Sequence, residues 1–97
     1  MKQFICILKP TRENISSNLS EREKTYFSEH FNRLKQAHSE GTLQLAGPSE
    51  DEKIGVIVFK SESIENAKKF IHDDPVIKNG LMTFTLHPFR AVLNNFK

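Results

Sequence analysis

The sequence predicts an α+β fold whose elements follow the order β-α-β-β-α-β. Two short apolar runs, residues 4–8 and 54–59, are rich in β-branched and aromatic side chains and indicate strands. Two longer segments carry apolar side chains at helical spacing. Each of them follows one of these apolar runs, the first after an intervening loop. Two further stretches alternate apolar and polar residues, which is typical of strands with one solvated face.

The first strand and the first helix are bounded by local signals. The strand at residues 3–9 ends before Pro10, because proline has no amide hydrogen to donate to a ladder. The helix begins at Ser20, where Glu23 completes a capping box, and ends just before Gly41. On a helical wheel its core-facing stripe is predicted to comprise Phe27, Phe31, Leu34 and His38.

The second half of the chain is predicted to contain a hairpin and a second helix. Residues 42–46 alternate, so that Leu43 and Leu45 are predicted to share one face, and they form a hairpin with residues 54–59. Ser61 or Ser63 caps the second helix, whose buried face is predicted to hold Ile64, Ala67 and Ile71.

The end of that helix is marked by a proline. The helix must stop by Asp74, because Pro75 disfavours helical geometry in the residue before it. The last strand is predicted at residues 82–87, with apolar side chains on one face and Thr83, Thr85 and His87 on the other. Residues 11–19 are predicted to form a loop, and residues 90–97 a short tail.

This order of elements is the ferredoxin-like arrangement, in which two helices cover one face of a four-stranded antiparallel sheet. The first and third strands are apolar on both sides, which suits the two central positions of the sheet. Because the helices bury only one face, the apolar residues on the other face need a second cover. We therefore expect a homodimer packed sheet against sheet.

Composition restricts the classes of protein that the chain can represent. At 97 residues the chain is predicted to form one domain, residues 1–97. A net charge of +2, from 14 basic and 12 acidic residues that do not cluster, argues against a nucleic-acid partner. No apolar stretch approaches membrane-spanning length. The single cysteine, Cys6, cannot form an internal disulfide, so a cytoplasmic location is expected.

Three stretches of the chain resemble the YciI-like (YCII-related) family in their order and spacing. They are Glu29-His30-Phe31 through Leu34, Gly41 through Pro48, and Asp74-Pro75 through Gly80 to His87-Pro88-Phe89-Arg90. The resemblance implies a dimeric α/β barrel and a cleft that holds one helix histidine and one aspartate before a proline. These residues are His30 and Asp74 here. Many relatives have an arginine three residues before the histidine, where this chain has Phe27.

A pair of this kind is suited to general acid/base chemistry. A carboxylate beside a histidine fixes which ring nitrogen carries the proton, and such a group contributes about 10²- to 10⁴-fold to a rate. Each residue also has a structural explanation: His30 as a hydrogen-bonded residue at the border of the apolar stripe, and Asp74 as the turn residue of an Asp-Pro step. Asp73 is the alternative acid, but the family motif places the acid directly before the proline.

Further candidate residues surround this pair. Pro48, His87, Phe89 and Arg90 are predicted to bind substrate, His87 and Arg90 by fixing an anionic group. Alternatively, His87-Pro88 only ends the strand and Arg90 is solvated. His38, in the middle of the predicted stripe, is expected to be structural and to offset the helix dipole. No metal site is expected, because the four histidines lack ligand spacing and there is no cysteine pair.

Three functions are therefore open at the level of sequence. The first is a cofactor-free enzyme in which His30, oriented by Asp74, moves a proton on a small organic substrate by isomerisation, elimination or hydrolysis. The second is a non-catalytic dimer that binds a small ligand in the same cleft. The third is an interaction module. The fold cannot choose among them, because one architecture hosts unrelated functions.

Overall fold

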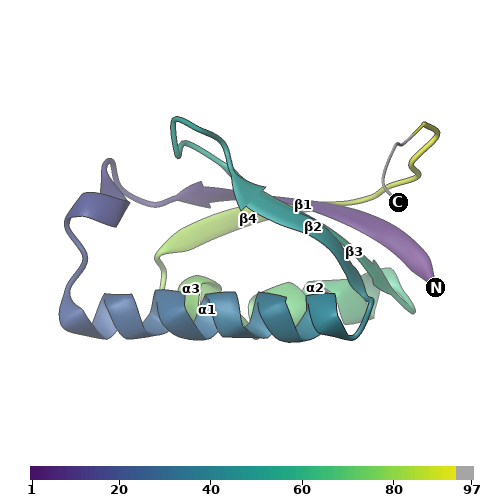
Figure 1. Cartoon of the computed structure of the whole chain (residues 1–97), viewed down its shortest axis with the longest axis horizontal. Helices are drawn as coiled ribbons and strands as arrows, with labels where there is room; N and C mark the ends of the chain where they lie inside the picture. Colours follow the sequence, from purple (N-terminus) through teal and green to yellow (C-terminus); the bar gives the residue numbers. More distant parts are fainter. Residues whose placement is uncertain (94–97) are drawn as a thin grey trace.

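Two layers make up the structure: a four-stranded antiparallel sheet and, on one of its faces, the helices (Figure 1). The coordinates are a computed structural model and describe residues 1–93. The last part of the predicted tail, residues 94–97, lies outside the described residues. No helix in the described part of the chain is long and apolar enough to cross a membrane.

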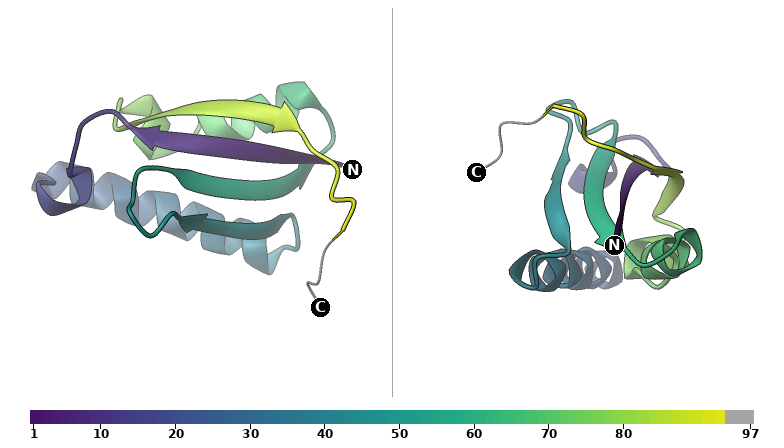
Figure 2. Two further views of the ribbon diagram at one scale, coloured as in Figure 1. Left: turned by 90° about the horizontal axis from the view of Figure 1, so that it is seen from above. Right: turned by 90° about the vertical axis from the view of Figure 1, so that its right-hand side faces the viewer.

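The sheet has the strand order β2-β3-β1-β4, with every neighbouring pair antiparallel. β1 (Lys2–Pro10) and β3 (Gly55–Ser61) are central, and β2 (Leu43–Pro48) and β4 (Met82–Pro88) are the edges. The prediction that the two doubly apolar strands occupy the centre is therefore confirmed. Seen along the strands, the sheet curves over the helix layer (Figure 2). This arrangement confirms the ferredoxin-like α+β fold.

The helices begin where the capping residues predict. α1 (Glu21–Ser39) has Ser20 as its N-cap, and Ser20 forms the predicted capping box with Glu23. Gly41 follows the end of the helix with a φ of 85°. α2 (Ile64–His72) is capped by Ser63, whose side chain accepts a hydrogen bond from the Asn66 amide. A short 3-10 helix, η1 (Ile15–Ser17), lies within the predicted loop.

The predicted core stripe of α1 is rotated from the one that the structure buries. The buried residues are His30, Leu34 and Ala37, whereas Phe31 is 53% exposed and His38 is exposed. His30, which the wheel placed at the border of the stripe, is buried and lies in a cavity wall. His38, which the wheel placed in the middle of the stripe, is exposed, so that predicted position is wrong. The reason is that one side of the apolar stripe lines a cavity under the sheet and is not packed in the core.

A β-bulge in β2 separates two leucines that were predicted to share a face. Leu43 lies opposite Phe59 and Leu45 lies opposite Val58, so one extra residue, Gln44, is inserted between them. The insertion reverses the alternation. Leu43 is consequently buried in the core, while Leu45 is half-buried, and the prediction of a common face is wrong.

The core lies between the sheet and α1 and α2. On the sheet, Phe4, Cys6, Leu8, Ile57 and Phe59 point to the helices and are buried; Ala67 and Ile71 of α2 pack with them, as predicted. The opposite face of the central strands carries Ile5, Ile7, Val56 and Val58.

Candidate functional site

Asp74 lies at the junction of two helices. α2 ends at His72, and a short helix that the sequence did not predict, α3 (Pro75–Lys78), begins directly after Asp74. Pro75 occupies its first position, where its missing amide hydrogen costs nothing and its fixed φ suits a helix start. Asp74 is the N-cap: its Oδ1 accepts a hydrogen bond from the Val76 amide at 3.0 Å. This bond fixes the carboxylate while its second oxygen remains available.

His30 meets that second oxygen. It lies on α1, 44 residues earlier in the chain, and its Nδ1 is 2.8 Å from Asp74 Oδ2. Both side chains are buried, with 7% and 6% of their surfaces exposed. The rings of Phe27 and Phe31 are both edge-on to the His30 ring, with ring centres 6.3 and 5.3 Å from its centre. The histidine is therefore held between aromatic side chains and one carboxylate.

Arg33 adds a cation to the same carboxylate oxygen. Its Nη1 donates to Asp74 Oδ2 at 2.9 Å, its Nη2 donates to the Phe70 carbonyl, and its guanidinium lies 4.7 Å from the centre of the Phe70 ring. Because Arg33 is one turn after His30, both side chains leave α1 on neighbouring sides. The pair expected from sequence is thus part of a three-residue cluster in which His30 and Asp74 are buried and Arg33 is partly exposed.

The environment keeps Asp74 ionised. Burial alone would raise the pKa of this carboxyl, but the hydrogen bond and charge of His30, the Val76 amide and the Arg33 guanidinium together hold the pKa below its ordinary value. An ionised carboxylate only accepts hydrogen bonds. The Nδ1 of His30 must therefore carry a proton and donate it, which leaves Nε2 as the nitrogen free for other partners.

Nε2 of His30 reaches open space. Within residues 1–93 no protein atom forms a hydrogen bond with it, although the side chain as a whole is buried. Yet no buried side-chain nitrogen or oxygen among these residues lacks a partner. Nε2 must consequently lie at an accessible surface, and His30 is part of the wall of an apolar cavity.

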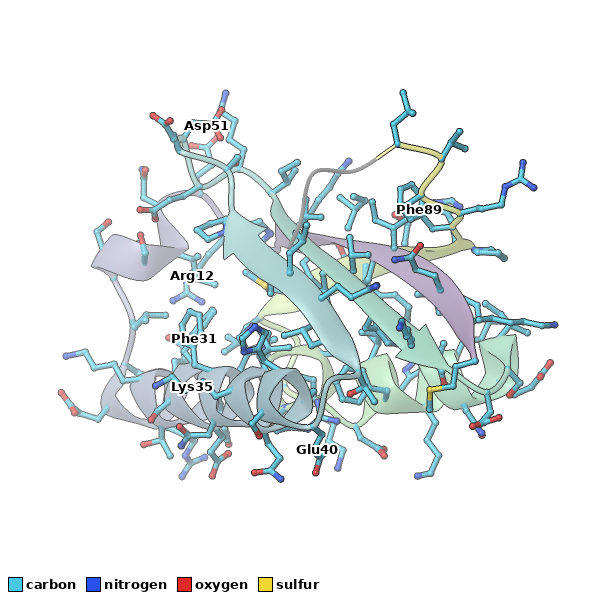
Figure 3. The ribbon with its side chains drawn as sticks, turned by 45° about the vertical axis from the view of Figure 1, so that its right-hand side comes forward. Arg12, Phe31, Lys35, Glu40, Asp51 and Phe89 are labelled. Carbon is cyan, nitrogen blue, oxygen red and sulfur yellow. The ribbon has the colours of Figure 1, made fainter. Side chains whose placement is uncertain are left out.

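That cavity has a volume of about 630 Å³ and lies between α1, η1 and the ends of β2 and β3. Its volume falls within the range typical of small-molecule sites. Figure 3 shows Phe31 rising from α1 beneath the loop that carries Arg12, with Lys35 beside it on the helix. Most of the wall is apolar; its larger apolar members include Leu8, Ile15, Leu19, Phe27, Phe31, Leu34, Ile54 and Met82.

Two loops close one end of the cavity. Ser16, in η1, donates a hydrogen bond to the carboxylate of Glu52, in the β2–β3 turn, and both residues line the cavity. Nearby, Arg12 binds Glu23 at the start of α1 through two hydrogen bonds of 2.9 and 3.0 Å. These contacts join the loop at residues 11–19 to the hairpin on one side and to α1 on the other.

The other predicted substrate-binding residues do not gather at this cavity. Pro48 lines it. His87, Phe89 and Arg90 do not: β4 begins opposite Pro10, beside the cavity, and ends opposite Phe4, at the far end of β1. Figure 3 shows Phe89 at the opposite end of the sheet from Asp51. Within one chain these three residues are therefore separated from His30, and their substrate-binding role stays a prediction.

Two more residues from the sequence argument have different positions. His38 lines the cavity from α1 instead of packing in the core. Cys6 is fully buried, and burial, followed by the negative charge of Asp74, raises the pKa of its thiol to about 12. In the part of the chain that the structure describes, no cluster of three or more histidine, cysteine or acidic side chains is arranged to hold a metal ion.

Arg33 is the functional residue that sequence reasoning missed. The signal was present, because a basic residue three positions after His30 faces the same neighbouring element as the histidine. The sequence did not predict α3. Without the N-cap geometry of Asp74, nothing indicates that one oxygen of its carboxylate can accept hydrogen bonds from both His30 and Arg33.

Fold and site together define a ferredoxin-like α+β protein with a cavity under its sheet and a buried His-Asp pair whose histidine lies in the cavity wall. The chain belongs to the family of YCII-related domains, whose model matches residues 3–90. A solved structure with this fold is 5-chloro-2-hydroxyhydroquinone dehydrochlorinase (TftG) from Burkholderia phenoliruptrix AC1100, in complex with 2,5-dihydroxybenzoquinone. It is 16% identical, with a TM-score of 0.66 over 90% of this chain and 93% of that one. No curated protein matches the sequence.

Proposed function

We propose that the chain is an enzyme in which His30 acts as a general acid/base on a small, largely apolar substrate bound in the apolar cavity that His30 lines. The observation that carries the proposal is the arrangement of the histidine ring. Ionised Asp74 holds Nδ1 at 2.8 Å, and Nε2 is left at the cavity surface. A proton donor or acceptor fixed in one orientation in the wall of an apolar cavity is suited to proton transfer.

Each partner of His30 has a distinct task in this proposal. Asp74 fixes the tautomer and stabilises positive charge on the ring when Nε2 gains a proton. Arg33 and the Val76 amide position Asp74 and keep it ionised. The wall around His30 is largely apolar, so charge interactions beside it are stronger than in bulk solvent. We expect the histidine to contribute about 10²- to 10⁴-fold to the rate.

Elimination is the reaction class that the similarity to a solved structure favours. That structure is described as a dehydrochlorinase and holds a quinone ring compound. In an elimination here, Nε2 of His30 removes a proton from the substrate, the electrons of the broken bond form a new double bond, and a leaving group departs as an anion. Isomerisation and hydrolysis are the alternatives that use the same proton transfer.

Turnover of a compound panel tests the proposal. Chlorinated hydroxyhydroquinones, small carboxylates and phenolic lactones are incubated with the protein, and product is followed by absorbance and chloride release. We expect at least one compound to be converted, and His30→Ala to lower kcat/KM by about 10²-fold or more. His72→Gln, which changes an exposed histidine of α2 away from the cavity, is the matched control. Equal turnover by the wild-type protein and His30→Ala would refute the role of His30.

A non-catalytic ligand-binding protein is the second candidate function. The observation in its favour is that Asp74 already has a structural task, because it caps α3 and holds Arg33. Under this alternative, ring compounds bind in the cavity of the wild-type protein without conversion. Binding that persists in His30→Ala and Asp74→Asn, with no turnover in any variant, would support it.

We also propose that the protein is a homodimer that packs through the open face of the sheet. Ile5, Ile7, Val56 and Val58 form an apolar strip along the central strands on that face. Light scattering at micromolar concentration should give twice the chain mass. Ile7→Asp should produce a monomer, whereas Lys68→Asp, on the exposed side of α2, should not. A wild-type monomer would refute this proposal.

A further inference from the structure

The cavity that holds His30 carries few charges. Among its described lining residues, only Lys35 and Glu52 have side chains that are charged at neutral pH apart from histidine. The Glu52 carboxylate already accepts a hydrogen bond from Ser16. The ammonium group of Lys35 has no ion-pair or hydrogen-bond partner within residues 1–93. Lys35 is therefore the cation in this wall that is available to a ligand.

Lys35 and His30 flank the same strip of α1 from opposite sides. They are five positions apart, which corresponds to about 7.5 Å along the helix axis and about 140° around it. The side chains between these two directions are Phe27, Phe31, Leu34 and His38, and all of them line the cavity. A ligand whose apolar body rests on this strip can consequently contact Nε2 of His30 at one edge and the ammonium of Lys35 at the other.

We propose that Lys35 binds an anionic group of the ligand, so that the cavity selects small organic anions with an apolar, ring-sized body. Glu52 belongs to the β2–β3 turn, on the other side of the cavity from α1, which places the anionic group against the helix. The inference rests on the proposed function for the identity of the reacting group at His30. It does not require turnover, because charge selection is a property of binding.

Binding of two isosteric probes tests this inference. Benzoate and benzamide have nearly the same shape, and only benzoate carries a charge. Each is titrated into the full-length protein while backbone amide resonances of cavity residues, such as Phe31 and Gly47, are followed by NMR. We expect benzoate to bind about tenfold more tightly than benzamide, and the preference to shrink as salt is added.

Variants of the same helix assign the preference to one residue. Lys35→Gln should abolish it, and Lys35→Arg should retain it because the charge is kept. Lys24→Gln makes the same change of charge at a residue of α1 that does not line the cavity, and should leave the preference intact. No preference in the wild-type protein, no binding of either probe, or a preference that survives in Lys35→Gln would overturn the inference.

The outcome is separable from that of the proposed function. His30→Ala should keep the preference for benzoate, because the residue has no part in binding the charge. If the preference depends on Lys35 and no compound is turned over, the anion site stands and the acid/base role of His30 fails. If turnover depends on His30 and benzoate is not preferred, the acid/base role stands and the anion site fails.

Discussion

Replacing Asp74 by asparagine is predicted to cost about 3 kcal/mol of unfolding free energy. Oδ1 of the new side chain can still cap α3 through the Val76 amide. The amide group that replaces Oδ2 is a donor. It opposes the donor Arg33 Nη1, which lies 2.9 Å from Oδ2, and it makes His30 Nδ1, at 2.8 Å, give up its proton and accept. Rotating the side-chain amide by 180° does not remove the conflict, because its NH₂ group then faces the Val76 amide, which is also a donor.

The magnitude follows from the burial of the three groups. A hydrogen bond to a charged group contributes about 1.5 to 3 kcal/mol, and breaking a buried pair costs about 3 to 5 kcal/mol. Arg33 is 28% exposed, so water replaces part of its lost partner, and His30 keeps a hydrogen bond to a neutral group by changing its tautomer. We therefore expect a value at the lower end, about 3 kcal/mol.

Urea unfolding measures this loss, with the neighbouring acid as the control. The midpoint of Asp74→Asn should fall by about 2 M for a domain of this size. Asp73→Asn removes an exposed ion pair with Lys69, at 3.0 Å, and should change the midpoint far less. Because the folded-state pKa of Asp74 is depressed, its stabilisation is complete above the unfolded value of about 3.9 and is lost as pH falls through the folded pKa. Similar midpoints for both variants would refute the buried cluster.

Two further predictions concern the residues around the site. Cys6, with a pKa raised to about 12 and no exposed surface, should resist thiol reagents at pH 8 until the protein unfolds; labelling of the native protein at the rate of a free thiol would contradict its burial. Glu23, whose pKa is lowered to about 2 chiefly by the Arg12 hydrogen bond, should stabilise the start of α1 above pH 4.5 and progressively less as pH falls toward 2. Circular dichroism should show a shallower acid transition in Glu23→Gln, and an unchanged one would be evidence against the Arg12–Glu23 contact.

Most of the fold could be predicted because its signals are local. Caps, prolines and alternation placed six main elements in order, and the doubly apolar strands predicted which two are central. The errors occurred where an apolar residue has two possible environments. The helical wheel could not distinguish a side chain that packs in the core, such as Leu34, from one that lines a cavity, such as Phe31. Alternation along β2 likewise could not reveal the bulge at Gln44.

The site was less predictable than the fold because its residues are distant in sequence. His30 and Asp74 are 44 positions apart, and only the family resemblance joined them before the structure placed their side chains within 2.8 Å. The contribution of Arg33 depends on α3, a helix of four residues that has no periodicity to detect. The direction of the His30 ring depends on the ionisation of Asp74, which is a property of the folded environment.

Nitrogen NMR of the histidine side chain tests whether Asp74 directs Nε2 of His30 into the cavity. With ¹⁵N-labelled histidine, we expect Nδ1 of His30 to carry a proton in the wild-type protein and to lose that preference in Asp74→Asn. We also expect a ring compound that fills the cavity to shift the Nε2 resonance more than the Nδ1 resonance. A neutral ring protonated on Nε2 would contradict the proposed orientation of His30. An Nε2 resonance that does not shift when a ligand shifts the resonances of Phe31 would also contradict it.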